Sequence, residues 1–309
     1  MASRDFSAWT PILWDTEVAQ REVQASAVIQ YGRLKPMTSN QIEIPRFVNA
    51  DVGGGSQLVE DTNNGDTTNM FSYQYNGKFT LDEAQTEDNP ANEVESTSYE
   101  WLNSFHISYD NACLGVSANR SATATNYQPY QSVYYAVTNN DTDMGYTANT
   151  NYTKTGSGGL TYDYANTGLG LVEATKFWNP MNAICIMHPT LKRSIRGIKD
   201  SQGRPIFVES SAGFPGGGVG PQYELFGIPA VFSFGAQVSA TYKMAVTGNP
   251  LLIFASRRHL VHGPRIDPQA KFISADINAN ALEHTLQTRA RKGFCATVPQ
   301  AFSVVEVGA

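Results

Sequence analysis

The densest group of reactive side chains in this sequence is an acidic stretch, residues 82–100, which holds seven carboxylates and no basic residue. Two neighbouring carboxylates can serve as the general acid and the general base of a hydrolytic reaction. No nucleophile or metal ligand accompanies this stretch, so an active site here has little support. We interpret the acids as the approach to a helix, since each carboxylate near a first turn contributes roughly 0.3–1 kcal/mol.

Other candidate sites each lack a residue that their chemistry requires. Residues 141–145 resemble the start of a calcium-binding loop, but the glycine and glutamate positions that should follow do not match. The glycine-rich residues 214–221 lack the Lys-Ser/Thr pair of a phosphate-binding loop. His188, directly before Pro189, is expected to be a turn residue. No Ser/His/Asp set and no His-Glu-x-x-His motif is present, so we expect no enzyme activity, metal or cofactor.

The cysteines indicate a reducing environment, and the hydropathy pattern indicates neither a membrane span nor a secretory signal. Cys113, Cys185 and Cys295 are far apart and have apolar neighbours, which predicts buried free thiols. No apolar run reaches the roughly 18 residues of a membrane span. The N-terminus has no basic segment followed by an apolar one, so a secretory signal is not expected.

The formal net charge of -6 conceals a difference between the two halves of the chain. Residues 1–150 hold 19 acids and 7 bases, or -12, whereas residues 151–309 hold 9 acids and 15 bases, or +6. This asymmetry is either an accident of composition or a sign that the acidic half of one copy packs against the basic half of a neighbour. Each exposed ion pair contributes only about 0–1 kcal/mol, so such packing would set orientation more than stability.

A helix expected over residues 189–198 concentrates positive charge. Its apolar residues Leu191, Ile195 and Ile198 would face the core, and its outward face would carry Lys192, Arg193, Arg196 and Lys199. A solvated exterior is the ordinary interpretation of such a face. The negative net charge argues against sequence-specific nucleic-acid binding. Contact with acidic surfaces of sister subunits fits the charge asymmetry better.

The pattern that organises the chain is a long helix expected over residues 97–114. Thr97 and Glu100 have the spacing of a capping box, and Gly115 is placed to end the helix in the left-handed conformation. Apolar residues recur at three and four positions and form one face: Leu102, Phe105, Tyr109, Ala112 and Val116.

Before this helix, residues 37–81 alternate with period two and predict a long β-hairpin. Its limbs would be residues 41–48 and 70–81, with a glycine-rich tip between them and a second turn signal at Asn76-Gly77. A two-stranded ribbon is marginally stable alone, so it needs a surface to lie on. Its aromatic residues Phe71 and Tyr73 are therefore candidate contacts with another subunit, as is Lys78.

The first 34 residues contain two tryptophans, Trp9 and Trp14, near the terminus. Tryptophans in a terminal segment require a surface that buries them. That surface belongs either to the same domain or to a neighbouring copy, and the second possibility makes both residues candidate inter-subunit contacts.

The rest of the chain divides into a polar part and an α/β part. Residues 117–168 are rich in Asn, Thr, Tyr, Ser and Gly, which predicts long loops and short strands exposed on one surface. After them we expect a helix over residues 164–177 and buried strands over residues 183–187, 225–232 and 251–255. A long strand over residues 280–302 is expected to return beside the long helix.

This order of elements resembles a tailed-bacteriophage major capsid protein of the Hong Kong 97 type. The resemblance covers nearly the whole chain, and the shared order of the motifs makes it specific. The local similarities are the helix end Asp110-Asn-Ala-Cys-Leu-Gly-Val, the segments Ala183-Ile-Cys-Ile-Met-His-Pro-Thr-Leu and Ile198-Lys-Asp-Ser-Gln-Gly-Arg-Pro-Ile, the strand Leu225-Phe-Gly-Ile-Pro-Ala-Val, and the closing segments Arg289-Ala-Arg-Lys-Gly-Phe and Val298-Pro-Gln-Ala-Phe.

The resemblance implies an α+β fold with five parts. Residues 1–34 would be an N-terminal arm and 35–82 an extended β-hairpin loop. Residues 83–119, with the long spine helix, and 271–309 would form a peripheral domain, and 120–270 an axial α/β domain.

The resemblance also carries two expectations about partners. Crosslinked members of the family join an extended-loop lysine to a peripheral-domain asparagine with a catalytic glutamate. Lys78 could be the lysine, but the other two positions fall on Leu282 and Arg289, so no crosslink is predicted. The arm begins directly after Met1, which implies a separate scaffolding protein.

Three functions follow as hypotheses. The first is a virion shell protein, assembled in the bacterial cytoplasm into hexamers and pentamers around double-stranded DNA. Its partners would be itself, scaffold and portal proteins, packaged DNA through non-specific contacts, and a possible decoration protein, with no membrane. The second is an encapsulin-like compartment with the same fold. The third, suggested only by the polar middle, is a β-rich glycan-binding protein or hydrolase.

Overall fold

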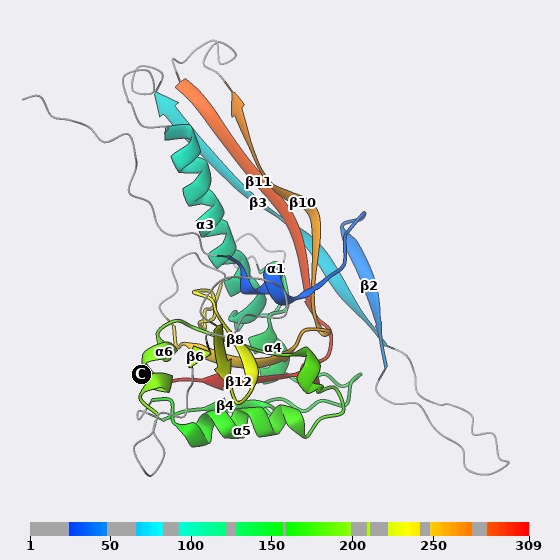
Figure 1. Ribbon diagram of the computed structural model, residues 1–309. Coiled ribbons are helices and arrows are strands. Elements are labelled where there is room, and N and C mark those ends of the chain that lie inside the picture. Colours follow the sequence, from blue (N-terminus) through cyan, green and yellow to red (C-terminus); the bar gives the residue numbers. More distant parts are fainter. Residues whose placement is uncertain are drawn as a thin grey trace, which may run out of the picture.

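The computed structural model describes residues 25–47, 66–82, 93–121, 128–156, 159–198, 209–210, 222–241, 248–273 and 283–308. These residues form two β-sheets with helices packed against them (Figure 1). One sheet is long and narrow, and the other lies at its lower end in the view of Figure 1. The fold is therefore mixed α+β, as predicted.

The long sheet has five strands in the order β1-β10-β11-β3-β2. Its strands are β1 (Arg33–Leu34), β2 (Gln41–Arg46), β3 (Asp66–Asp82), β10 (Leu260–Ile273) and β11 (Glu283–Ala296). β11 is antiparallel to both β10 and β3. The expected strand at the end of the chain thus lies in the centre of this sheet.

The predicted hairpin of residues 41–48 and 70–81 differs from the observed pairing. β2 pairs with the first part of β3, from Gln41 opposite Phe71 to Arg46 opposite Asp66. The remainder of β3 pairs with β11, from Phe71 opposite Phe294 to Asp82 opposite Glu283. The alternating pattern was correct, but a strand only 6 residues long, β2, cannot cover a strand of 17. The C-terminal strand provides the missing partner.

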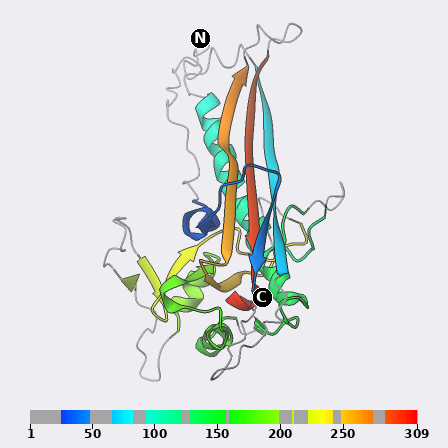
Figure 2. The ribbon, with the colours of Figure 1, turned by 90° about the vertical axis from the view of Figure 1, so that its right-hand side faces the viewer.

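The helix α3 (Glu93–Leu114) runs alongside the three long strands (Figures 1 and 2). It begins four residues before Thr97, so the predicted capping box is not its start. Its apolar face is as predicted, because Phe105, Tyr109 and Ala112 are buried. The return of the C-terminal strand to the helix is also confirmed, since the Tyr109 hydroxyl donates a 3.0 Å hydrogen bond to the Gly293 carbonyl.

Two glycines at this interface have roles that the sequence did not indicate. Asn76-Gly77 is not a turn but lies inside β3, where a Cβ on Gly77 would come within 2.8 Å of the Trp101 ring. Gly115 does not adopt a positive φ. A Cβ at Gly115 would lie 1.9 Å from the Gln237 carbonyl oxygen, so close approach of another backbone explains this residue.

The second sheet has seven strands in the order β4-β12-β9-β5-β8-β7-β6. They are β4 (Tyr152–Lys154), β5 (Ala183–Met187), β6 (Glu209–Ser210), β7 (Gln222–Leu225), β8 (Ile228–Phe232), β9 (Leu251–Ser256) and β12 (Phe302–Glu306). β5 and β9 are fully buried, as predicted. The single strand expected over residues 225–232 is instead a hairpin. Its two-residue turn, Phe226-Gly227, has positive φ at both positions.

Short helices complete this half of the molecule. They are α5 (Tyr162–Glu173), whose buried side packs beside β9 and β12, α6 (Leu191–Arg196), and the 3-10 turns Pro180–Asn182 and Pro299–Ala301. α5 and α6 are shorter than the helices predicted over residues 164–177 and 189–198. α6 buries Leu191 and Ile195, as the apolar spacing of the sequence indicated. The two sheets share chain connections, since β9 leads into β10 and β11 leads into β12.

The polar residues 117–168 are not an exposed insertion, and that expectation was wrong. They include α4 (Val133–Thr138) and β4, and their buried side chains include Tyr130, Val133, Val137, Met144 and Tyr146. The Tyr130 hydroxyl donates a 2.5 Å hydrogen bond to the Lys292 carbonyl, and Asn151 Nδ2 donates one of 2.9 Å to the Phe302 carbonyl. The polar composition gave a wrong prediction because polar side chains can be buried when they form hydrogen bonds to backbone carbonyls, as Tyr130 and Asn151 do.

Two further sequence predictions can be compared with the structure. Cys113, Cys185 and Cys295 are free and buried, as expected. Burial raises the pKa of Cys295 to about 11, which keeps its thiol protonated at neutral pH. None of the helices within the described ranges is long and apolar enough to cross a membrane.

A buried carboxylate ties β12 to the polar segment and to the loop before β9. Glu306 accepts hydrogen bonds from the hydroxyls of Tyr152 at 2.6 Å and Tyr134 at 2.8 Å, and from Asn249 Nδ2 at 2.6 Å. It also forms an ion pair of 2.8 Å with Lys154. Burial alone would raise the pKa of Glu306, but the bonds from Lys154, Tyr152, Asn249 and Tyr134 outweigh it and lower the pKa to about 2.

This arrangement predicts an acid-sensitive contribution to stability. A carboxylate whose folded pKa is lowered stabilises the fold above its unfolded pKa, and the contribution is lost as the pH falls toward the folded value. We expect Glu306→Gln to lower the free energy of unfolding by about 2 kcal/mol at pH 7 and to flatten its decline between pH 5 and 2. Urea denaturation at several pH values measures both effects. A decline as steep as that of the wild type would contradict this role.

Candidate functional site

The end of α3 is joined to two other segments through the buried side chain of Asp110. Its carboxylate accepts hydrogen bonds from the Ala27 amide at 2.8 Å, the Val28 amide at 3.3 Å and the Ser233 hydroxyl at 2.6 Å. The Ser26 hydroxyl is a further donor. Asp110 therefore caps the N-terminus of α1 (Ala27–Tyr31), while Ser26 caps it a second time through the Ile29 amide. Burial raises the pKa of Asp110, and the four donors oppose that rise.

The neighbouring Asn111 holds the loop after β8. Its Nδ2 donates to the carbonyls of Gly235 at 3.1 Å and Gln237 at 3.0 Å, and its Oδ1 accepts a 2.9 Å bond from the Ser239 hydroxyl. Asp110 and Asn111 together fix three parts of the chain that are far apart in sequence: α1, the last turn of α3 and the segment 233–239. This point, the helix-end junction, couples the two sheets.

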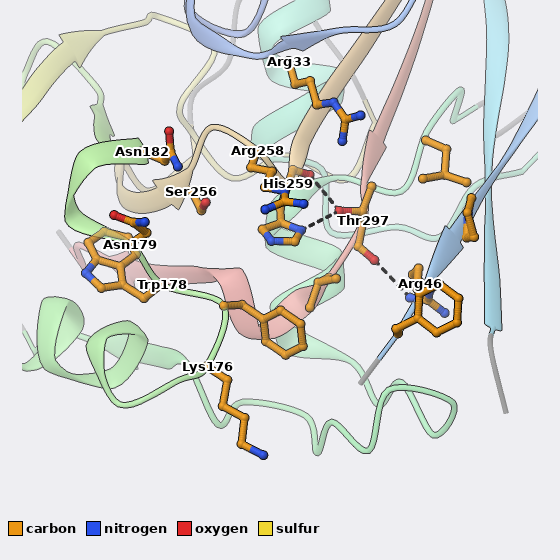
Figure 3. Close-up of a pocket in the computed structure, with 15 residues that line it drawn as sticks. Arg33, Arg46, Lys176, Trp178, Asn179, Asn182, Ser256, Arg258, His259 and Thr297 are labelled. Carbon is orange, nitrogen blue, oxygen red and sulfur yellow. Dashed lines mark hydrogen bonds between the residues drawn. The ribbon is translucent and has the colours of Figure 1, made fainter. Parts of the chain in front are cut away.

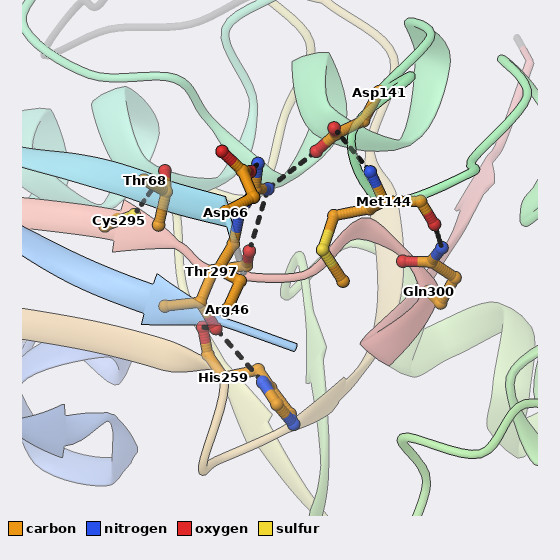
Figure 4. Close-up of polar contacts among 9 residues, drawn as sticks. All are labelled: Arg46, Asp66, Thr68, Asp141, Met144, His259, Cys295, Thr297 and Gln300. Atoms are coloured by element: carbon orange, nitrogen blue, oxygen red, sulfur yellow. Dashed lines mark hydrogen bonds and ion pairs between the residues drawn. The ribbon is translucent and has the colours of Figure 1, made fainter. Parts of the chain in front are cut away.

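A second polar cluster holds the base of the β2–β3 hairpin (Figure 4). Arg46, at the end of β2, forms ion pairs with Asp66 and, at 2.6 Å, with Asp141. It also donates a 3.2 Å hydrogen bond to the Thr297 carbonyl. Asp141, the first residue of the segment that resembles a calcium-binding loop, is thus an ion-pair partner of Arg46. Among the described residues no group of three or more His, Cys, Asp and Glu could hold a metal ion.

Beside this cluster a cleft of about 480 Å³ opens between the hairpin base and the second sheet (Figure 3). One wall comes from β2 and from Arg33, and the opposite wall from the segment that includes Trp178, Asn179 and Asn182. Its floor is formed by the two connections between the sheets, which contribute Ser256, Arg258, His259, Thr297 and Val298. We name it the arginine cleft.

His259 is fixed and neutral in the floor of this cleft. Its Nδ1 lies 3.0 Å from the Thr297 hydroxyl oxygen. Burial lowers the pKa of His259 to about 4, and the positive charges of Arg258 and Arg33 contribute. His259 therefore carries no charge at neutral pH, and the positive charge near it comes from Arg33 and Arg258. Sequence reasoning missed this cleft, although the consecutive basic residues Arg257-Arg258-His259 between two strands were a signal that it could have used.

The aromatic candidates are largely engaged within the chain. Phe71 is half-buried and lies under the Arg120 guanidinium, whose central carbon is 3.4 Å from the ring centroid. Tyr73 is half-buried and packs edge-to-face on Tyr75, with 4.9 Å between ring centroids. Contact of either ring with another copy stays a prediction. Trp9 and Trp14 lie outside the described residues.

The basic candidates have different environments. Lys78 is exposed on the open face of the long sheet, opposite Gln287 of β11 rather than on the hairpin, while Leu282 lies outside the described residues. Lys192 is half-buried and bonds the Tyr223 hydroxyl, with its Nζ 3.8 Å from that ring's centroid. Arg193 and Arg196 are exposed, as predicted for the outer face. The structure therefore does not gather the candidates that it describes into one site.

His188 is a turn residue, as expected. It is buried directly after β5, and its Nδ1 lies 2.7 Å from the Thr190 hydroxyl oxygen. Burial lowers the pKa of His188 to about 4.

The helix-end junction predicts a difference between two substitutions. Asp110→Ala leaves four buried donors without an acceptor, and we expect it to lower the free energy of unfolding by about 3 kcal/mol. Asp110→Asn keeps one acceptor and removes a buried charge, so a loss of about 1 kcal/mol is expected. Chemical denaturation measures both, and the exposed Asp143→Ala is the control. Equal losses for the alanine and asparagine variants would contradict the capping role.

No protein-family model matches this sequence, and no curated protein matches it. Solved structures, in contrast, match over nearly the full length. A chain of the structure described as "Capsid of native GTA particle computed with C5 symmetry" aligns with a TM-score of 0.65 and 13% identity, covering 100% of both chains. A chain from Mycobacterium phage Ogopogo aligns with a TM-score of 0.68 and 12% identity, covering 99% of both.

A third example is a chain from Microbacterium phage Oxtober96, with a TM-score of 0.65, 16% identity and coverage of 98% of this chain and 99% of that one. At such identities the likeness concerns the fold. This chain therefore has the mixed α+β fold of phage and GTA capsids, the Hong Kong 97-type fold that its order of motifs predicted.

Proposed function

We propose that this chain is a major capsid protein that forms the hexamers and pentamers of an icosahedral shell around the double-stranded DNA of a tailed bacteriophage. The observation that carries the proposal is the match, along the full length of both chains, to a chain from a GTA particle capsid. The role is structural: each copy contributes surface rather than chemistry.

Exposed apolar side chains support self-association. Met181 is 91% exposed, Phe47 67% and Leu34 57%, and all three are large enough to stabilise an interface when covered. Permanent interfaces of this kind bury on the order of 2,000–5,000 Å². The low content of charged residues, 16%, agrees with a surface that is largely covered in the assembly.

Within this proposal the parts of the chain take the roles that the resemblance implied, with three shifted boundaries. The resemblance implied 1–34 as the arm, 83–119 and 271–309 as the peripheral domain, and 120–270 as the axial domain. The pairing of β12 with β9 in the second sheet favours assigning residues from Phe302 onward to the axial domain. The pairing of β3 with β11 favours an extended loop of 35–71 rather than 35–82. Likewise, the position of β10 in the long sheet favours assigning residues from Leu260 onward to the peripheral domain.

The further partners follow from the same role. A shell of this type needs a portal and a scaffold, touches packaged DNA without sequence preference, and can carry a decoration protein on its outside. The protein would then be a virion component assembled in the host cytoplasm.

Electron microscopy of the purified protein tests the proposal. We expect capsomer rings or closed shells in negative stain, and shells purified from infected cells should contain double-stranded DNA. A monodisperse monomer at every concentration would contradict the proposal, and shells that enclose an enzyme instead of DNA would favour an encapsulin-like compartment.

The arm gives a second test. We expect deletion of residues 1–24 to leave folded subunits that do not close shells, because the surface that Trp9 and Trp14 cover on neighbours would stay exposed. The deletion stops before Ser26, Ala27 and Val28, which are buried in the subunit itself. Deletion of residues 1–8, which keeps both tryptophans, is the control. Normal shells from the longer deletion, observed by sedimentation and microscopy, would show that the arm is dispensable.

A further inference from the structure

Residues 32–40 form a strap that crosses the long sheet between α1 and β2. The strap begins with β1, which pairs in parallel with β10 and places Leu34 opposite His262. The Lys35 amide then donates a 2.8 Å hydrogen bond to the His262 carbonyl. Figure 2 shows this blue segment passing from α1 to β2 across the long strands. The first half of the strap is therefore attached to β10 around a single histidine.

The second half of the strap is held by contacts that do not change charge in mild acid. The Met37 amide donates a 3.1 Å hydrogen bond to the Pro264 carbonyl. A Cβ at Gly263 would lie 2.7 Å from Met37 Cγ, so this part of the strap lies directly on the backbone of β10. Further along, the Arg291 guanidinium donates a 2.8 Å hydrogen bond to Asn40 Oδ1.

The helix before the strap, α1, has an anchor of its own in the helix-end junction. The Asp110 carboxylate accepts hydrogen bonds from the Ala27 and Val28 amides at 2.8 and 3.3 Å. Burial raises the pKa of Asp110. A carboxyl whose folded pKa is raised favours the folded state more as the pH falls, so the titration of Asp110 does not release α1 in acid.

The first half of the strap covers a titratable side chain. His262 is only 3% exposed, and a Cβ at Gly32 would lie 3.0 Å from its Cδ2 atom. Burial lowers the pKa of His262 to about 4, the positive charge of Lys292 contributes, and a hydrogen bond with the Gly32 backbone opposes the shift. At neutral pH the imidazole is therefore uncharged, and the backbone of the strap packs directly against it.

The charged and titratable side chains on the elements around His262 are those of Tyr31, Arg33 and Lys35 in α1 and the strap, His259 and Asp267 before and within β10, Lys292 of β11, and Asp110 of α3. Lys292 Nζ forms a 2.5 Å ion pair with Asp267. His259 is neutral, since its pKa is lowered to about 4 as well. A proton on His262 thus adds a buried positive charge close to Lys292, which is a costly arrangement.

We propose that His262 is a pH-sensitive latch whose protonation shifts residues 32–35 toward a state released from β10, while α1 and the second half of the strap stay in place. A buried imidazole resists a proton and an imidazole uncovered by release accepts one, so acid favours release. The closed state is fully favoured above about pH 6.5 and loses this advantage as the pH falls toward the folded value.

The latch concerns a single subunit and does not require assembly. Its meaning for a shell rests on the proposed function, in which α1 belongs to the arm and β2 to the extended loop. The strap joins these two parts, so the latch sets how firmly they are coupled through β10. A measurement on subunits therefore tests the latch separately from the proposed function.

Hydrogen exchange of the full chain, followed by mass spectrometry, tests the latch. A pKa of about 4 in the closed state and about 6.5 after release makes the opening constant about 30 times larger at pH 5 than at pH 7.5. We expect this rise in peptides that cover residues 32–37, after correction for the intrinsic exchange rate. A peptide from β9 should show no such rise. Equal rises in both peptides would indicate global unfolding in acid and would contradict the latch.

Neutral substitutions identify the histidine responsible. In His262→Gln the opening constant of residues 32–37 should change less than about threefold between the two pH values, because the titrating group is absent. His188→Gln is the matched control, since His188 is also buried with its pKa lowered to about 4 but lies after β5 in the other sheet. This control should keep the full rise. A rise that survives His262→Gln, or that is lost in His188→Gln, would overturn the inference.

Two further measurements keep the test decisive. His259→Gln removes the neighbouring imidazole and should keep at least about a tenfold rise; loss of the rise in this variant alone would assign the switch to the wrong histidine. If His262→Gln does not fold, the wild type decides. Its opening constant should increase about sevenfold between pH 6 and 5, as the uptake of one proton requires, and a constant value over this range would contradict the latch.

Discussion

The structure depends on one buried carboxylate. Asp110 lies in the last turn of α3 and collects donors from the start of α1 and from Ser233 in the loop after β8. A buried carboxylate is tolerated only when donors surround it, so the three segments must come together for any of them to be stable there. Asn111 adds hydrogen bonds from its side-chain amide to the backbone carbonyls of Gly235 and Gln237. This junction contributes to the relative placement of the two sheets, together with the chain connections from β9 to β10 and from β11 to β12.

Aromatic packing determines how α3 lies on the long sheet. Trp101, Phe105 and Tyr109 stack along one face of the helix, and Tyr75 of β3 meets two of them edge-to-face. Tyr130, from the polar segment, continues the series to Phe294 of β11. Rings of this size bury a large area in each contact, so a narrow sheet with a single helix can form a stable core. Gly77 makes room for Trp101 and so allows the helix to approach.

The buried and half-buried carboxylates of the described residues have partners within the subunit. Carboxylates inside the subunit are individually satisfied: Asp110 by α1, Asp66 and Asp141 by Arg46, and Glu306 by Lys154 and its hydroxyl donors. Asp110, Asp141 and Glu306 each bond residues that are far away in the sequence, so the compensation of these charges also fixes tertiary contacts.

By itself the sequence determined the features that depend on local periodicity. The apolar face of α3, the buried strands β5 and β9, the buried thiols and the order of elements that indicates the capsid fold were all predictable. A repeating pattern reports which side of an element is covered, whatever covers it. The sequence also identified the acidic stretch and the charge asymmetry.

Only the tertiary structure decided what each covered side meets. It assigned β11 as the partner of Phe71–Asp82, placed Asn76-Gly77 inside a strand, and brought the polar residues around Tyr130 into the core. It also assembled the arginine cleft from residues as distant as Arg33, Arg258 and Thr297. Each of these depends on contacts between segments more than a hundred residues apart, or on close approach of a side chain at a glycine. Neither leaves a periodic signal in the chain, because pairing and proximity are properties of the folded arrangement.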